Sequence, residues 1–188
     1  MWDFIDPPVR AWFAKRVVVV GAESTGTTTL ARDLARALKT VWVPEYGREY
    51  SERKQAARDE IWSSQEFLKI AREQTRMEDQ AARQANRILI CDTNAFATCL
   101  WHQRYMGFDH EPLVEFAQGC RADLYLLTGD EIPFVQDGLR DGEHIRHEMH
   151  QWFETALAQQ HVPWLHICGS AEERLNAAMK VINELLRP

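Results

Sequence analysis

Residues 16–30 read RVVVVGAESTGTTTL, and this stretch determines the fold that we expect. Its four consecutive valines form a short apolar run, which is typical of a strand covered on both faces. Glycines follow at positions 21 and 26 with the spacing of the phosphate-binding loop GxxxxGK[ST], and a helical pattern begins at Thr27. Such glycines let successive N–H groups converge on phosphate oxygens, and the helix dipole adds to the attraction. The stretch therefore predicts a strand, a phosphate loop and a helix.

The residues of this loop are the first candidate site residues. We expect eight of them to contact a bound nucleotide: Gly21, Glu23, Ser24, Thr25, Gly26, Thr27, Thr28 and Thr29. The Thr28 hydroxyl would also ligate a Mg²⁺ ion that bridges the terminal phosphates. Position 27, where the motif has lysine, is threonine. An ordinary glycine turn between strand and helix is the alternative.

Four further runs have the length and the β-branched or aromatic content of buried strands. They span residues 41–46, 88–92, 124–128 and 164–169, and helical patterns lie between them, among others at 27–39, 64–85 and 171–186. Alternation of this kind predicts an α/β fold with a parallel sheet of five strands, including residues 16–21, and helices on both faces. Ligands of such folds bind at the carboxyl ends of the strands.

Two carboxylates stand at the ends of these predicted strands. Glu45 closes the run at 41–46 and Asp92 closes the run at 88–92, so both would project beside the phosphate loop. One carboxylate at such a place can hold Mg²⁺, and another can accept the proton of an attacking hydroxyl. The alternative for Asp92 is a cap on the helix that follows. For Glu45, which stands beside an apolar strand, a purely structural role such as a helix cap is a weaker explanation than for Asp92.

A polar segment with two glycines spans residues 137–146, between the fourth strand and a helix. Gly138 and Gly142 are candidate hinges of a small lid that would carry Arg140 and Arg146 over the phosphates. The alternative is a solvated loop, and the nearby phosphate loop favours the lid.

Histidines, cysteines and tryptophans give weaker signals. His144, His147 and His150 recur every three residues, and we expect a solvated polar face there rather than a metal site. The four cysteines include no CxxC pair and are expected to be free buried thiols. Most of the seven tryptophans should lie in the core, although Trp42 or Trp62 is a candidate for stacking on a ligand ring.

Composition places the chain among soluble globular proteins. It has 188 residues, of which 45% are hydrophobic and 27% charged, and this length suits one domain over residues 1–188. We find no apolar run long enough to span a membrane and no apolar stretch of a signal peptide, so a cytoplasmic protein is expected. The net charge of −6 argues against a nucleic-acid partner.

Four segments in order resemble a known family. They are GAESTGTTTL at 21–30, PEYGREY at 44–50, ICDTN at 90–94 and VQDGLR at 135–140. Together they resemble the nicotinamide riboside kinase domain of the bifunctional bacterial NadR-type proteins. Residues 1–15 resemble the linker that follows an adenylyltransferase domain in that family, and no adenylyltransferase activity is expected from this chain. Two positions depart from the family pattern: Thr27 replaces the loop lysine, and Asn94 replaces the second acid of a DTD motif.

The resemblance implies a P-loop kinase fold and an enzyme of NAD biosynthesis. The implied reaction is the ATP- and Mg²⁺-dependent phosphorylation of the 5′-hydroxyl of nicotinamide riboside, giving nicotinamide mononucleotide. Carried over by motif, Glu45, Tyr46 and Arg48 would bind the ribose. Asp92 would belong to the Mg²⁺ and acceptor site, and Arg140 to the lid. Ser170, after the last strand, would lie near the adenine.

The hypothesis that follows is in-line attack by the ribose hydroxyl, which Glu45 orients and deprotonates, with Mg²⁺ held by Thr28 and Asp92. Catalytic roles are thus assigned to Glu45, Asp92 and Arg140. Two alternatives stay open. One is a nucleotide-binding or sensor module without catalysis, because the loop lacks its lysine. The other is a kinase for another nucleoside.

Overall fold

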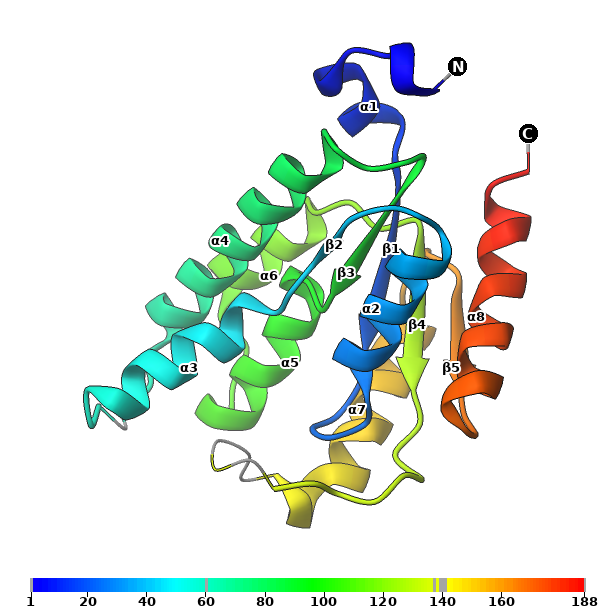
Figure 1. Cartoon of the computed structure of the whole chain (residues 1–188). Helices are drawn as coiled ribbons and strands as arrows, with labels where there is room; N and C mark the ends of the chain where they lie inside the picture. The colour runs from blue at the N-terminus through cyan, green and yellow to red at the C-terminus, as the bar shows by residue number, and fades with distance from the viewer. Residues whose placement is uncertain (1, 60, 137, 139–141, 188) are drawn as a thin grey trace.

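Five parallel strands form one sheet in the order β2-β3-β1-β4-β5 in the computed structural model (Figure 1), which describes residues 2–59, 61–136, 138 and 142–187. The strands are β1 (Lys15–Val20), β2 (Trp42–Val43), β3 (Ile88–Asp92), β4 (Leu124–Thr128) and β5 (Trp164–Ile167). The helices are α1 (Pro7–Phe13), α2 (Thr27–Ala37), α3 (Tyr46–Ala56), α4 (Ser64–Ala82), α5 (Ala95–Met106), α6 (Glu111–Gln118), α7 (Arg146–Ala158) and α8 (Ala171–Leu185), with 3-10 turns η1 (Trp2–Phe4) and η2 (Glu143–Ile145).

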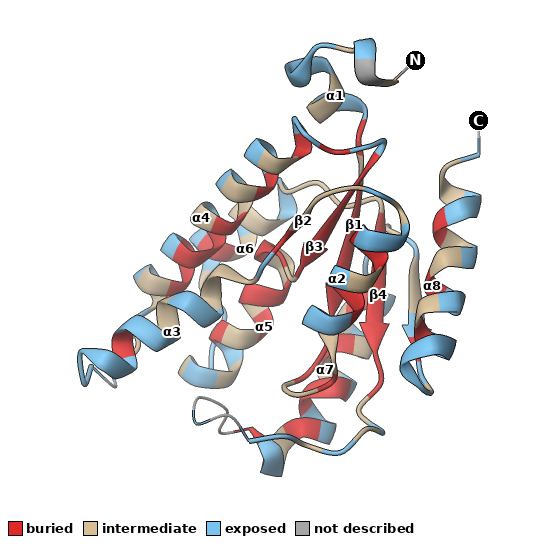
Figure 2. Cartoon of the chain, in the orientation of Figure 1, coloured by how far each residue is buried: buried red, intermediate tan, exposed pale blue. Residues whose placement is uncertain are grey.

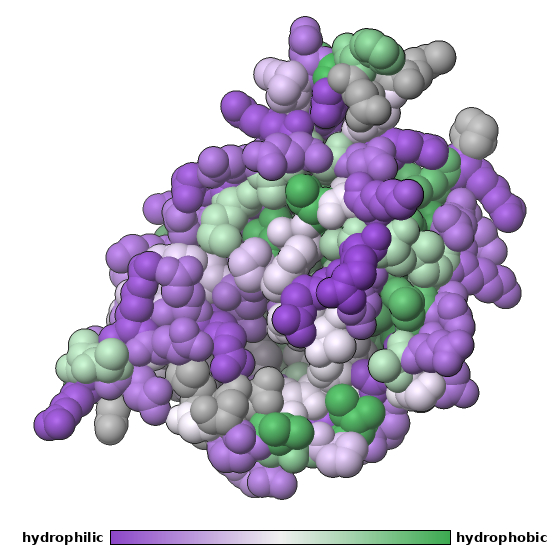
Figure 3. Space-filling model, in the orientation of Figure 1, coloured by the Kyte–Doolittle hydropathy of each residue, from purple (hydrophilic) through white to green (hydrophobic). Residues whose placement is uncertain are grey.

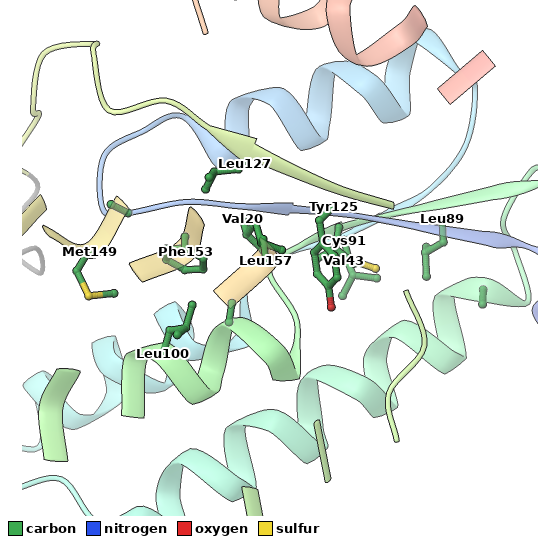
Figure 4. Packing of buried hydrophobic residues seen from close by; sticks show 14 of the residues in the cluster. Val20, Val43, Leu89, Cys91, Leu100, Tyr125, Leu127, Met149, Phe153 and Leu157 are labelled. Carbon is green, nitrogen blue, oxygen red and sulfur yellow. The ribbon is translucent and has the colours of Figure 1, made fainter. Parts of the chain in front are cut away.

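The central strand β1 is buried on both faces, as its four valines predict. Val17 and Val19 pack against α2 and α8, whereas Val18 and Val20 pack on the opposite face, against α4, α5 and α7. This second cluster includes Phe153 and Leu157 of α7 (Figure 4). Buried residues are concentrated in the strands and on the helix faces that turn toward them (Figure 2). The predicted α/β fold, a five-stranded parallel sheet with helices on both faces, is confirmed.

The second strand is shorter than predicted. β2 contains only Trp42 and Val43, because Pro44 has no N–H to donate and α3 begins at Tyr46. The Tyr46 N–H donates to Oε1 of the buried Gln74 (2.9 Å), which fixes the start of α3 against α4. Glu45 is therefore the residue before α3, in an extended conformation, and not part of a strand. The other four strands agree with the prediction to within two residues at each end.

The four cysteines differ in how far they are buried. All four are free thiols. Cys91 in β3 is buried and Cys168 after β5 is exposed, while the other two are half-buried. The prediction of buried thiols is therefore wrong for Cys168.

The N-terminal segment contacts the helices around the sheet and leaves apolar side chains exposed. Trp2 Nε1 donates to the Ala85 carbonyl oxygen after α4 (2.7 Å). Phe4, Trp12 and Phe13 are exposed, and Figure 3 shows green, hydrophobic residues on this segment. Among the described residues, no helix has the length and apolar character needed to cross a membrane.

A buried carboxylate of α4 makes stability depend on pH. Glu78 is 1% exposed and lies 3.6 Å from Arg16 Nη1, and its Oε1 has no hydrogen-bond partner among the described residues. Burial raises the pKa of Glu78 to about 8, and the charge of Arg16 opposes this only in part. The folded protein therefore holds a proton that the unfolded chain releases near the ordinary pKa of 4.5.

We expect the free energy of unfolding to fall as the pH rises from about 5 to about 8, by at most ~1.4 kcal/mol per pH unit, because the folded state binds the extra proton in this window. Glu78→Gln should remove that slope, as measured by urea unfolding across the window. Glu73→Gln, on the exposed side of the same helix, is the control. Parallel profiles for wild type and Glu78→Gln would contradict the prediction.

Candidate active site

The loop between β1 and α2 is supported by two buried threonine hydroxyls. Thr25 Oγ1 donates to the Ala22 carbonyl oxygen (2.7 Å) and lies 2.7 Å from Oγ1 of Thr128 at the end of β4. A Cβ at Gly21 would lie 2.3 Å from the Thr128 oxygen and 2.6 Å from the Thr25 oxygen. Glycine is therefore required at position 21. The Thr25 side chain supports the loop from inside, which leaves its backbone, not its hydroxyl, to meet a nucleotide.

The turn into α2 has the backbone geometry of an anion site. Gly26 precedes the helix with φ +85°, and Ser24 has φ +60°. No side chain caps the helix, so the N–H groups of its first turn, including those of Thr27, Thr28 and Thr29, point out of its N-terminus. Such a terminus stabilises a phosphate through these N–H groups and the helix dipole.

Two arginines that are largely buried hold this loop in place. Arg174 of α8 donates from Nη1 to the Thr25 carbonyl oxygen (2.6 Å), and its charge is balanced by Glu131 (2.7 Å). Arg146, the first residue of α7, donates from Nη2 to the Ser24 carbonyl oxygen (3.0 Å). The expectation that Arg146 is carried over the phosphates by a lid is therefore wrong. Its guanidinium is buried beneath the loop, where it satisfies backbone carbonyl groups.

Glu23 connects the loop to two other parts of the chain. Its Oε1 accepts a hydrogen bond from Nη1 of Arg104 in α5 (2.7 Å), and its Oε2 accepts one from the Gly142 N–H (2.8 Å). The loop is thus tied to Gly142, the second predicted hinge of the lid segment. Arg140, the predicted lid arginine, lies outside the described residues.

Asp92 and Thr28 form a pair of oxygen ligands beside the loop. Thr28 Oγ1 donates to Asp92 Oδ2 (2.5 Å), and Asp92 Oδ1 is buried with no hydrogen-bond partner among the described residues. Burial raises the pKa of Asp92, and hydrogen bonding to Thr28 and Thr27 opposes this rise. A hydroxyl and a carboxylate are hard ligands of the kind that Mg²⁺ prefers, and the oxygen without a partner fits a cation.

The helix that follows is capped by Asn94, not by Asp92. Asn94 Oδ1 accepts a hydrogen bond from the Ala97 N–H (3.3 Å), and its amide donates to the Tyr125 hydroxyl (3.1 Å). The cap alternative for Asp92 is thereby overturned. Between these residues, Thr93 adopts φ +66°, which is unusual for a β-branched residue and typical of backbone held under constraint at a site.

A cleft beside the loop brings several of the predicted residues together. Its lining residues are Val19, Val20, Gly21, Ala22, Glu23, Thr27, Thr28, Glu45, Gly47, Arg48, Ser51, Trp62, Phe67, Ile70, Gln74, Thr93, Thr98, Trp101 and Tyr105. A Cβ at Gly47 would lie 3.3 Å from Glu45 Oε1, so the Glu45 carboxylate folds back over the first turn of α3. Arg48 enters from the same turn.

Not every predicted residue lines this cleft: Ser24, Thr25, Gly26, Thr29 and Asp92 belong to the loop or its surroundings, and Tyr46 and Ser170 lie elsewhere. Tyr46 does not line this cleft but a separate surface hollow between α3 and α4. Ser170 caps α8: its hydroxyl donates to Glu173 Oε2 (2.7 Å) and accepts from the Glu173 N–H (3.3 Å). A structural role therefore accounts for Ser170, and its predicted place near an adenine stays a prediction.

Aromatic side chains form the wall of the cleft away from the loop. The Trp62 ring lies 5.6 Å from the Tyr105 ring and 5.0 Å from the Phe67 ring, measured between centroids, and Trp101 lines the same cleft. Of these residues, only Trp62 was predicted from the sequence as a candidate for stacking on a ligand ring. Trp101 and Tyr105 are four residues apart on the helix that follows Asp92, and this spacing was a signal that both share a face.

Comparisons with known proteins agree with this geometry. The family described as AAA domain matches residues 16–174. The chain is 27% identical over 168 residues to the trifunctional NAD biosynthesis/regulator protein NadR of Salmonella typhimurium, and 30% identical over 139 residues to NadR of Escherichia coli. These matches cover 88% and 74% of this chain but only 41% and 34% of the relatives.

Solved structures extend the likeness to three dimensions. A crystal structure of NadR protein in complex with NR matches with a TM-score of 0.81 and 26% identity, covering 98% of this chain and 55% of that one. Thymidylate kinase from Ehrlichia chaffeensis matches with a TM-score of 0.64 at 14% identity, covering 90% of this chain and 98% of that one, which shows the shared fold alone. The resemblance to the NadR kinase domain and the P-loop kinase fold are thus confirmed, and the chain spans about half or less of the length of its NadR relatives.

Proposed function

The chain belongs to the AAA domain family, and we propose that within this family it transfers the γ-phosphate of ATP to the 5′-hydroxyl of nicotinamide riboside, producing nicotinamide mononucleotide. One observation carries the proposal. A single cleft is lined by residues of the phosphate loop together with a carboxylate, an arginine and aromatic rings. The similar NadR structure in complex with NR supports this choice of acceptor.

The donor end suits the triphosphate of ATP. The uncapped first turn of α2 offers N–H groups to the phosphates, and the loop around it is prearranged by Thr25, Arg146 and Arg174. Mg²⁺ bound to Thr28 and Asp92 would neutralise charge that develops on the phosphates. The chain's own contribution is to hold the transferred group in line with the acceptor.

The acceptor end suits a nucleoside whose base is aromatic. The pyridinium ring of nicotinamide riboside can stack on Trp62 and Tyr105, whose rings also contact the Lys54 ammonium (5.0 Å) and the Arg104 guanidinium (4.8 Å), respectively. Glu45 lines the same cleft, where it can accept the proton of the 5′-hydroxyl, and Arg48 can bind the remaining ribose hydroxyls.

A panel of nucleosides tests the proposal. ADP release would be measured with ATP and Mg²⁺ in the presence of nicotinamide riboside, adenosine, cytidine, uridine, guanosine and thymidine. We expect turnover with nicotinamide riboside and little with the neutral nucleosides. Preferred turnover of a neutral nucleoside would assign the kinase another acceptor.

We expect Trp62→Ala to raise KM for nicotinamide riboside by about tenfold or more and to leave KM for ATP nearly unchanged, because base stacking on one aromatic ring is worth about 1–3 kcal/mol. Steady-state kinetics with each substrate varied in turn provides the measurement. Trp12→Ala is the matched control, since Trp12 is exposed on α1, away from the cleft. An unchanged KM for nicotinamide riboside would remove the aromatic wall from the acceptor site.

The second candidate function is a nucleotide-binding module without catalysis, and the specific observation in its favour is Thr27. A phosphate loop normally presents a lysine to the β- and γ-phosphates, and backbone N–H groups supply only partial charges. The charges of Arg32 and Arg48 oppose the rise that burial causes in the pKa of Asp92, so positive charge does reach the neighbourhood of the loop. We therefore favour the active enzyme.

Thr27→Lys separates the two functions. If the loop has the geometry of a nucleotide site, the added ammonium should tighten binding of ATP·Mg²⁺ by about tenfold or raise turnover, as calorimetry and ADP release would show. Lys15→Thr, which alters a lysine at the opposite end of β1, is the control. If the wild-type protein binds ATP but does not turn it over, the result favours the nucleotide-binding module without catalysis. If neither wild type nor Thr27→Lys binds ATP, residues 21–28 are a structural turn and both functions fail.

A further inference from the structure

Three donor side chains converge at the contact between α7 and β5, outside the cleft. His150 and Glu154 lie one turn apart on α7, and His166 lies on β5. Glu154 Oε1 is 3.6 Å from His150 Nε2 and 4.0 Å from His166 Nδ1, and the three donor atoms all lie within 4.8 Å of one another. Both pair distances are too long for hydrogen bonds. In a tetrahedral zinc site, ligand atoms lie about 3.4 Å apart, so small rotations of these side chains suffice.

Of the three residues, His150 is the one whose burial is not matched by hydrogen bonds to described residues. It is 4% exposed, and neither of its ring nitrogens makes a hydrogen bond to a described residue. An imidazole buried in this way has lost its hydration without a replacement, which costs roughly 1–3 kcal/mol. Burial also lowers the pKa of His150. The expected solvated polar face is therefore wrong for this histidine.

His166 is oriented by its other nitrogen. Its Nε2 lies 3.3 Å from Cys168 Sγ, which leaves Nδ1 on the side of Glu154. A ring that binds a metal through one nitrogen carries a proton on the other, and a partner for that proton fixes the ring and its tautomer. Cys168 supplies such a partner.

We propose that His150, Glu154 and His166 bind a zinc-class divalent cation that joins α7 to β5. Two imidazoles and one carboxylate form a recognised zinc ligand set with a fourth position for water, and the partial exposure of Glu154 and His166 leaves that position open. Arg146, one turn before His150 on α7, donates to the Ser24 carbonyl oxygen. The cation would therefore fix to the sheet the same helix that supports the phosphate loop.

Metal titrations of the full chain, stripped of metal beforehand, test this site without reference to activity. Co²⁺ reports its coordination through visible absorption bands, and Zn²⁺ would be titrated in competition with it. We expect one ion per chain, tetrahedral Co²⁺ bands and a higher Tm with Zn²⁺. Glu154→Gln and His166→Ala should each weaken binding at least tenfold. These residues are partly exposed, so the test stands even if His150→Ala does not fold.

Two controls make the result specific. His161→Ala removes an exposed histidine outside the cluster and should leave binding unchanged. Cys168→Ser should weaken binding only modestly, because the thiol orients His166 and is not a ligand. The proposal is overturned if no ion binds below about 100 µM, if binding survives both ligand variants, or if Cys168→Ser alone abolishes it, which would indicate a thiolate site instead.

Discussion

Glu45→Gln should lower kcat by about 10²- to 10⁴-fold and leave the affinity for ATP nearly unchanged. The expected size is that of a lost general base. Glutamine keeps the shape of the side chain that folds back over Gly47, but it cannot accept the proton of the attacking hydroxyl. Steady-state kinetics with nicotinamide riboside, together with calorimetry for ATP, measures both quantities.

Glu73→Gln is the matched control for this variant, because Glu73 pairs with Arg76 on the surface of α4. A kcat near that of wild type would exclude Glu45 from the chemistry. An equal loss of kcat and of ATP binding would instead indicate a disturbed loop. The prediction is therefore that kcat falls while the affinity for ATP stays nearly unchanged, and both parts must hold.

Asp92→Asn should reduce turnover by about 10²- to 10³-fold at low Mg²⁺ and shift the Mg²⁺ requirement upward, because a carboxylate that holds a catalytic cation contributes several kcal/mol. The free energy of unfolding should rise or stay unchanged, although turnover falls. Burial raises the pKa of Asp92, which means that its charge is poorly solvated in the folded protein, and asparagine removes that charge. A Mg²⁺ titration of activity and a thermal melt would be compared with wild type.

Asp123→Asn serves as the control, since Asp123 binds the Arg16 N–H and Lys15 at the amino end of β1. An unchanged Mg²⁺ titration for Asp92→Asn would show that Asp92 is not part of the metal site. A large loss of stability would mean that the carboxylate serves the fold. Neither outcome is expected from an oxygen that is buried without a hydrogen-bond partner among the described residues.

The architecture followed from local patterns in the sequence, because strands buried on both faces read as continuous apolar runs. Val17 to Val20 and the runs ending at Asp92 and Thr128 are of this kind. The second strand was overestimated because the predicted run was continued through Pro44 and Glu45 to Tyr46, where the chain already turns into α3. Pattern alone does not show that the Tyr46 N–H pairs with a glutamine 28 residues away.

The candidate site was predictable where a motif carried it and unpredictable where packing decided it. Gly21, Thr28, Glu45 and Arg48 all line one cleft, as their motifs indicated. Long-range contacts decided the rest. Arg146 reads like a mobile phosphate ligand, yet its guanidinium binds the Ser24 carbonyl oxygen.

Local sequence patterns also fail to predict which residue caps a helix and which aromatic residues line the cleft. Asn94 replaces an acid in the motif because here its side chain caps α5 and binds the Tyr125 hydroxyl. Trp101 and Tyr105 read like core residues of a helix, and only the approach of the loop before α4 makes them a wall of the cleft. Such residues can be recognised from the sequence only after the topology is known.

The most direct test of phosphate transfer is a ³¹P NMR spectrum of the wild-type chain incubated with ATP, Mg²⁺ and nicotinamide riboside, because it identifies both products at once. The expected result is that the ATP resonances are replaced by those of ADP and of a phosphate monoester whose coupling places it on the 5′-carbon of the riboside. Unchanged ATP after prolonged incubation, or conversion to ADP and inorganic phosphate alone, would contradict it.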